Sequence, residues 1–167
     1  MHLLLLGYGR MGKLVDQLSE SYGCEVTGRL DIDTNPRGAG ITAEQVAGVD
    51  VAIDFSTADA VVDNLPRLAH HGVNLVVGTT GWQANEDAMR QIAADAGIGV
   101  VAAANFSLGV NLFLALTERA AELFEPRPEF GAWIHEIHHA AKLDAPSGTA
   151  LALQNKMSER GYSHQID

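Results

Sequence analysis

Four consecutive leucines at residues 3–6 run directly into a glycine-rich sequence, Gly-Tyr-Gly-Arg-Met-Gly. A short apolar run that ends in glycine predicts a buried strand and a turn, and apolar residues at positions 14, 15 and 18 predict a helix after it. In such a unit the first glycine permits the tight turn, the second lets a pyrophosphate approach the backbone, and the third allows the helix to pack on the strand. The pattern therefore predicts a dinucleotide-binding turn made of Gly7, Tyr8, Gly9, Arg10, Met11 and Gly12.

An acidic residue stands about twenty positions beyond this turn, as dinucleotide-binding folds require. Residues 25–30 predict a second strand, and Asp31 follows at its carboxyl end. There its carboxylate can accept hydrogen bonds from the ribose hydroxyls and repel a 2′-phosphate, which favours NADH somewhat over NADPH. The alternative interpretation is that Asp31 only begins a turn. Arg29 and Arg37 are near enough in sequence to turn toward a phosphate, so both cofactors stay open.

Strands and helices then alternate along the chain. Apolar runs predict strands at residues 51–55, 74–77 and 99–103, and helical spacing predicts helices at 57–71 and 84–96. This alternation is typical of an α/β fold with a doubly wound parallel sheet of the Rossmann type, whose ligands bind beyond the carboxyl ends of the strands.

Beyond Ala104 the pattern changes. Residues 107–124 predict a long helix with leucines along one face, residues 125–128 end it, and residues 129–136 have the composition of a strand. Pro146 and Ser147 predict the start of another helix. We therefore expect a dinucleotide-binding domain over residues 1–104 and a partial α+β substrate-binding domain over residues 105–167.

The overall charge excludes two classes of partner. A formal net charge of -10 argues against binding to nucleic acid or to an anionic membrane, because an acidic surface repels both. The hydrophobic content of 47% is typical of a soluble α/β protein, and no apolar run approaches a membrane-spanning length. The single cysteine lies in no metal or redox motif. These features predict a cytoplasmic protein without a metal.

Residues 138–150 combine side chains suited to proton transfer. His138, His139 and Lys142 lie close together in sequence, and their surroundings can bring their pKa values toward neutrality. Unpaired N–H groups at the predicted helix start beside them can hold a carboxylate or a phosphate. The alternative is a solvated loop in which the histidines have no chemical role.

The sequence HHAAKLDAPSGTA at residues 138–150 resembles, residue for residue, the signature of the 4-hydroxy-tetrahydrodipicolinate reductases, nicotinamide-dependent enzymes of diaminopimelate and lysine synthesis. Residues 7–12, 78–81 and 103–107 resemble further motifs of that family. The resemblance implies hydride transfer from NADH or NADPH to a small anionic dicarboxylate, 4-hydroxy-tetrahydrodipicolinate, which loses water and becomes tetrahydrodipicolinate. It also implies cofactor contacts at Gly78, Thr79, Thr80, Ala103, Ala104, Asn105 and Phe106.

The resemblance assigns a role to each residue of the signature. His138 corresponds to the general acid/base, and Lys142 to the donor of a proton to the electron-rich ring that hydride addition leaves. The substrate carboxylate would be held by His139 and by the N–H groups of Ser147, Gly148 and Thr149.

The resemblance also sets an expectation for the end of the chain. Similar enzymes continue with further strands, which complete a second sheet and mediate tetramer formation, and with a closing helix. We therefore expect residues 105–167 to be an incomplete domain, and a homo-oligomer, a tetramer where that segment is present. A chain ending at Asp167 is expected to bind NADH and to reduce the substrate poorly, and a non-catalytic NAD-binding module or fragment is the alternative function.

A zinc hydrolase is a less favoured alternative. His135, Glu136 and His139 satisfy the HExxH motif, which holds zinc only on a helix. On the strand predicted here, the two histidines would stand roughly 13 Å apart, too far for one metal ion.

Overall fold

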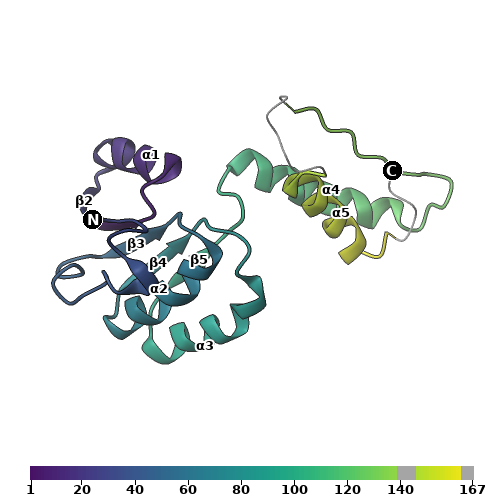
Figure 1. The fold of residues 1–167 in the computed structure, drawn as a ribbon. Coiled ribbons are helices and arrows are strands. Elements are labelled where there is room, and N and C mark those ends of the chain that lie inside the picture. The colour runs from purple at the N-terminus through teal and green to yellow at the C-terminus, as the bar shows by residue number, and fades with distance from the viewer. Residues whose placement is uncertain (139–145, 163–167) are drawn as a thin grey trace. The chain divides into compact units, whose positions relative to one another are not determined.

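Five parallel strands form a sheet in the order β2-β1-β3-β4-β5 (Figure 1). Their bounds are β1 His2–Leu6, β2 Glu25–Leu30, β3 Val51–Asp54, β4 Asn74–Val77 and β5 Val100–Ala102. The computed structural model describes residues 1–138 and 146–162, and the chain divides into two compact units, Met1–Ala104 and Asn105–Asp167. The chain passes from β1 outward to β2 and then back to β3, so the predicted doubly wound α/β fold is confirmed.

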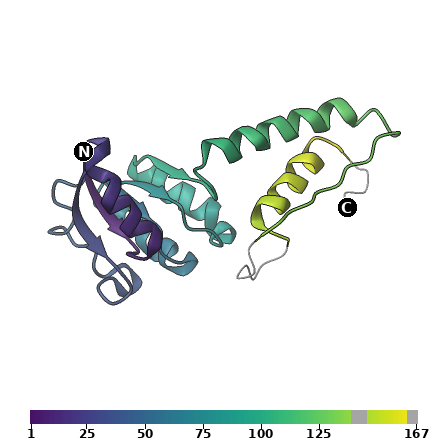
Figure 2. The ribbon, with the colours of Figure 1, turned by 90° about the horizontal axis from the view of Figure 1, so that it is seen from above.

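Three helices connect these strands. They are α1 (Arg10–Ser19), α2 (Ala58–His70) and α3 (Glu86–Ala96). Right-handed crossovers place α1 on one face of the sheet and α2 and α3 together on the other, as Figures 1 and 2 show. Thr57 begins α2, as predicted, because its side-chain oxygen accepts a hydrogen bond from the Ala60 N–H.

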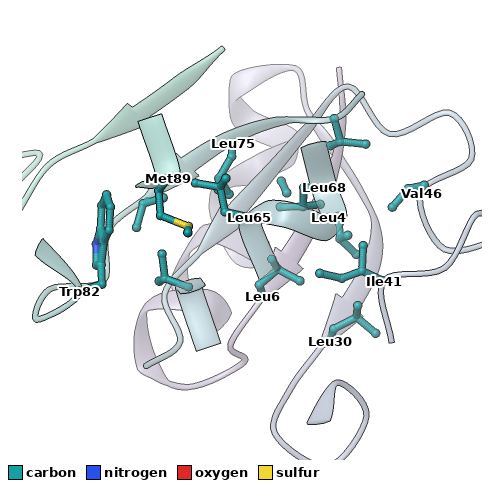
Figure 3. Close-up of a cluster of buried hydrophobic side chains, with 14 residues drawn as sticks. Leu4, Leu6, Leu30, Ile41, Val46, Leu65, Leu68, Leu75, Trp82 and Met89 are labelled. Atoms are coloured by element: carbon teal, nitrogen blue, oxygen red, sulfur yellow. The ribbon is translucent and has the colours of Figure 1, made fainter. Parts of the chain in front are cut away.

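The hydrophobic core lies between the sheet and the two helices α2 and α3 that cover one of its faces. All four leucines of β1 are buried, since a central strand covered by helices on both faces has no side turned to water. Figure 3 shows Leu4 and Leu6 in one cluster with side chains of neighbouring strands, of α2 and α3 and of the loops. The other labelled members of the cluster are Leu30, Ile41, Val46, Leu65, Leu68, Leu75, Trp82 and Met89.

The second unit contains α4 (Leu108–Phe124) and α5 (Gly148–Glu159), which pack on one another. Their predicted starts are confirmed, because Ser107 and Ser147 accept hydrogen bonds from the N–H groups three residues on. The Arg160 guanidinium forms an ion pair with Glu118, which links the two helices. No helix in the described part of the chain is both long and apolar enough to cross a membrane.

The strand predicted over residues 129–136 is wrong. Only Ala132 makes an isolated bridge there, and the remaining residues up to 138 form neither strand nor helix. Aromatic and β-branched residues favour a strand only when a neighbouring strand supplies hydrogen bonds, and the described residues supply none beyond this bridge. The segment is instead held by side chains. The Tyr162 hydroxyl donates to the Phe130 carbonyl at 2.9 Å, and the Phe124 and Phe130 rings pack edge to face.

Candidate functional site

The turn after β1 depends on three glycines for three different reasons. Gly7 has a φ of +85°, and a Cβ there would lie 2.4 Å from the Phe55 carbonyl oxygen. A Cβ on Gly12 would lie 2.2 Å from the Gly7 carbonyl oxygen, so α1 can pack on the turn only without a side chain. A Cβ on Gly9 would meet nothing within 4 Å, which leaves open space above its backbone. Such a turn fits a dinucleotide pyrophosphate.

Two adjoining grooves follow the carboxyl edge of the sheet on either side of this turn. The first, of about 420 Å³, is lined by Gly7, Asp31 and the loop that contains Arg37. The second, of about 380 Å³, is lined by Arg10, Met11 and residues 78–80. The two share four residues, Gly9, Phe55, Ser56 and Thr57. The fold thus brings the predicted adenosine-side and nicotinamide-side residues onto one continuous track.

Several predicted cofactor residues lie off this track. Tyr8 and Gly12 belong to the turn but line neither groove. Ala103 and Ala104 follow β5 at the same edge, and the Ala103 N–H donates to the Val77 carbonyl at 3.1 Å. Asn105 and Phe106 belong to the second unit, where the Asn105 side chain accepts a hydrogen bond from the Ser107 N–H.

Asp31 both begins a turn and faces the first groove. Its backbone carbonyl accepts hydrogen bonds from the N–H groups of Thr34 and Asn35, at 3.0 and 2.8 Å. Its Oδ1 accepts one from the Ile32 N–H at 3.0 Å, while Oδ2 has no hydrogen bond to the described residues. The two interpretations of Asp31 are therefore compatible, because one carboxylate oxygen shapes the turn and the other is available to a ribose hydroxyl.

An ion pair beside the glycine turn was not predicted from the sequence. The Arg29 guanidinium donates through Nε and Nη2 to the two oxygens of Asp16, at 2.7 and 2.6 Å, and the Tyr8 hydroxyl donates to the same carboxylate. The hydrogen bond from Arg29 has the largest effect and that from Tyr8 the next largest, and both lower the pKa of the Asp16 carboxyl. Arg29 is thus engaged on α1, whereas Arg37 lines the first groove.

In the second unit, Glu136 joins His138 to the start of α5, and sequence reasoning had given it no part in the substrate site. Its Oε1 accepts a hydrogen bond from the Ser147 N–H at 2.8 Å, and its Oε2 lies 2.9 Å from His138 Nε2. The contact with His138, and after it those with Ser147, lower the pKa of Glu136 to about 2. A carboxylate held in this way can orient the His138 imidazole.

The predicted carboxylate cradle at the start of α5 is partly engaged. The Ser147 N–H donates to Glu136, and the Ala150 N–H donates to Ser147 Oγ at 3.1 Å. The N–H groups of Gly148 and Thr149 make no hydrogen bonds with the described residues, as is usual for the first turn of a helix. His139 and Lys142 lie outside the described residues.

The zinc hydrolase alternative needs a helix that carries His135, Glu136 and His139. Residues 133–138 are not helical, and His139 of the motif lies outside the described residues. Within 1–138 and 146–162, no three His, Cys, Asp or Glu side chains are grouped to hold a metal ion.

The contact between Glu136 and Ser147 should depend on pH. Because the pKa of Glu136 is depressed to about 2 from its ordinary value of 4.5, its stabilising effect is present above pH 4.5 and is lost as the pH falls through about 2. We expect the Ser147 amide resonance in an NMR titration to shift with a midpoint near 2. Glu136→Gln should remove this titration and Glu129→Gln should not, and a midpoint near 4.5 in the unaltered protein would contradict the contact.

Comparison with known proteins places both units in one family. The family model described as "Dihydrodipicolinate reductase, N-terminus" matches residues 1–106, and the model described as "Dihydrodipicolinate reductase, C-terminus" matches residues 109–166. A solved structure of a dipicolinate-bound dihydrodipicolinate reductase from Paenisporosarcina sp. TG-14 aligns with a TM-score of 0.72 and 23% identity. It covers 99% of this chain and 68% of that chain, and the likeness shows the same fold.

Relatives named 4-hydroxy-tetrahydrodipicolinate reductase come from bacteria and an archaeon. The chain is 36% identical to the Christiangramia forsetii protein over 96% of its own length and 65% of that relative. It is 39% identical to the Cutibacterium acnes protein, over 90% of its own length and 57% of that relative. It is 38% identical to the Archaeoglobus fulgidus protein, over 87% of its own length and 60% of that relative. The chain therefore spans less than two thirds of the length of these relatives.

Proposed function

We propose that this chain, which belongs to the dihydrodipicolinate reductase family, takes part in the NADH- or NADPH-dependent reduction of 4-hydroxy-tetrahydrodipicolinate to tetrahydrodipicolinate. The reaction would serve diaminopimelate and lysine synthesis. The observation that carries the proposal is the pairing of an open glycine turn, Gly9 between Gly7 and Gly12, with a groove that continues on both sides of it.

The cofactor end of the reaction belongs to the first unit. Asp31 would accept hydrogen bonds from the adenosine ribose, the turn around Gly9 would hold the pyrophosphate, and residues 78–80 would lie toward the nicotinamide. The bound cofactor would supply the hydride.

The substrate end belongs to the second unit. His138 would act as the general acid/base, and Lys142 would donate the proton that the ring needs once hydride has been added. His139 and the N–H groups of Ser147, Gly148 and Thr149 would hold a carboxylate. Among these, the Ser147 N–H would have to leave Glu136, whereas Gly148 and Thr149 would have no hydrogen bond with the described residues to give up. The Paenisporosarcina reductase, which was solved with dipicolinate bound, supports a dicarboxylate substrate.

The resemblance implies assignments beyond the site as well. We propose a cytoplasmic homo-oligomer, a tetramer where the further C-terminal segment is present, and measurement of the mass in solution by light scattering tests the oligomeric state. The function itself is tested by supplying the purified protein with NADH and freshly generated 4-hydroxy-tetrahydrodipicolinate, and following the loss of nicotinamide absorbance. Binding of NADH without turnover would favour a nucleotide-binding module instead.

The cofactor preference gives a separate prediction. Asp31 should repel a 2′-phosphate, and Arg29, which is paired with Asp16, should not compensate, so NADH is expected to bind more tightly than NADPH. Asp31→Ser should raise the affinity for NADPH about tenfold, which corresponds to ~1.4 kcal/mol. Fluorescence titration with both cofactors measures this. Asp33→Ser, two positions away on the same loop, is the matched control, and tenfold tighter binding of NADPH by the unaltered protein would refute the role of Asp31.

A further inference from the structure

A fully buried carboxylate lies beneath the nucleotide track. Asp54, the last residue of β3, is 0% exposed and has no basic side chain within ion-pairing distance among the described residues. Its Oδ1 accepts hydrogen bonds from the Ser56 N–H at 2.9 Å, the Ser56 hydroxyl at 2.5 Å and the Thr79 hydroxyl at 3.1 Å. Its Oδ2 accepts one from Asn64 Nδ2 at 2.9 Å. The four donors come from three different segments of the chain.

Two amides extend this set of contacts to the loop after β2. Asn35 Nδ2 donates to Asn64 Oδ1 at 2.8 Å, and the Gly40 N–H donates to Asn35 Oδ1 at 2.9 Å. The orientation of both amides is fixed, because a backbone N–H at one end can only donate and a carboxylate at the other end can only accept. We call Asp54, Ser56, Thr79, Asn64 and Asn35 the Asp54 network.

The Asp54 network reaches both grooves of the track. Asn35, Ser56 and Asn64 line the adenosine-side groove, while Ser56 and Thr79 line the nicotinamide-side groove. A buried charge without a cation costs stability, and an apolar residue of similar size would avoid that cost. A group that accepts four hydrogen bonds can, however, fix the loops after β3 and β4 with respect to α2, and Asn64 on α2 extends this order through Asn35 to the loop after β2.

We propose that Asp54 is a positioning residue that sets the loops after β2, β3 and β4 in the one arrangement that binds the whole dinucleotide. This inference rests on the proposed function, since it assigns the track to NADH or NADPH. Asp54 acts only through its partners, because its own oxygens are buried away from the groove.

The direction of the hydrogen bonds supplies a sharp test. Asp54→Asn places an NH₂ group against the NH₂ group of Asn64, and Asn64→Asp places two carboxylates together. The double variant Asp54→Asn/Asn64→Asp restores the pattern, because the new amide donates to the new carboxylate, whose other oxygen still accepts from Asn35. The charge of the buried pair is the same as in the unaltered protein.

Binding should follow this pattern. At a temperature well below the melting point of every variant, Asp54→Asn should weaken NADH binding at least tenfold, and Asn64→Asp should weaken it more. The double variant should return to within about threefold of the unaltered protein. Asp87→Asn, which removes one exposed carboxylate from α3, is the control for charge alone. Unchanged NADH affinity in a folded Asp54→Asn protein, or a double variant no better than the worse single variant, would overturn the proposal.

A second measurement needs no ligand and separates this inference from the proposed function. Trp82 is buried, and its indole N–H donates to the Thr79 carbonyl at 2.9 Å, so its fluorescence reports on the loop after β4. In a Trp133→Phe background, Asp54→Asn should shift the Trp82 emission and speed hydrogen exchange of the Gly40 amide on the distant loop. The double variant should reverse both changes. If the unaltered protein fails to bind NADH while these changes appear, the proposed function fails and the linkage of the loops stands. Absence of both changes contradicts the linkage itself.

Discussion

Replacing His138 by Gln, or Lys142 by Ala, is expected to lower turnover by roughly two to four orders of magnitude while NADH affinity stays near that of the unaltered protein. Both side chains are assigned to proton transfer in the transition state, and neither belongs to the unit that contains the glycine turn and Asp31. For His138 the structure adds a reason, because Glu136 holds its imidazole at 2.9 Å. Steady-state kinetics together with an NADH titration measure the two effects separately.

Matched controls for these variants are available on two helices, since His70 is exposed and Lys156 is half-buried and pairs with Glu159. His70→Gln at the end of α2 and Lys156→Ala on α5 remove the same chemical groups and should leave turnover within about twofold. Turnover like that of the unaltered protein in both His138→Gln and Lys142→Ala would contradict the assignment.

Two substitutions in the glycine turn should separate folding from cofactor binding. Gly12→Ala places a methyl group 2.2 Å from a backbone oxygen, so α1 must shift, and we expect a loss of ~1–3 kcal/mol of stability as well as of NADH binding. Gly9→Ala meets nothing within 4 Å, and its backbone is extended, so stability should change by less than ~0.5 kcal/mol. The added methyl group would nevertheless occupy the space of the pyrophosphate and weaken NADH binding at least tenfold. Thermal unfolding measures the stability of both variants, and fluorescence titration measures their NADH binding.

Gly109→Ala in α4 controls for the loss of a glycine. Its Cβ would make only an ordinary contact, 3.8 Å from Ser107 Oγ, so NADH binding should be unaffected and the helix slightly stabilised. If Gly12→Ala melted and bound NADH like the unaltered protein, the close packing of α1 on the turn would be wrong.

The elements that local pattern determines could be predicted from the sequence. Strand β2 over residues 25–30 has the predicted bounds, and the caps at Ser107 and Ser147 begin the predicted helices. The strand over 129–136 failed because a strand depends on a neighbour that local composition does not reveal. The long helix at residues 108–124 could be predicted, because a helix forms its backbone hydrogen bonds within its own segment. Its sequence does not reveal a partner for the exposed leucines on its surface, such as Leu112 and Leu116.

In the candidate site, too, the residues that follow from local sequence could be predicted and those that depend on distant contacts could not. The glycine turn and Asp31 follow from spacing within one strand-turn-helix unit, and His138 from the signature. Glu136 and Asp54 were missed, because their roles arise from contacts between segments far apart in sequence. One signal was present for Asp54: an acidic residue that ends an apolar strand and is followed two positions later by serine suggests a buried turn.

The central place of β1 has a consequence for the growing polypeptide. β1 is synthesised before both of its neighbours in the sheet, Glu25–Leu30 and Val51–Asp54. Until β3 has emerged, a strand made of four leucines lacks at least one of its partners, and a segment of this kind associates readily with other exposed strands. The nascent chain therefore passes through a stage in which the four leucines of β1 are not yet covered by the folded sheet. Ribosome-bound chains that stop before Val51 should bind a chaperone that recognises leucine-rich segments, and chains extended well beyond Asp54 should release it.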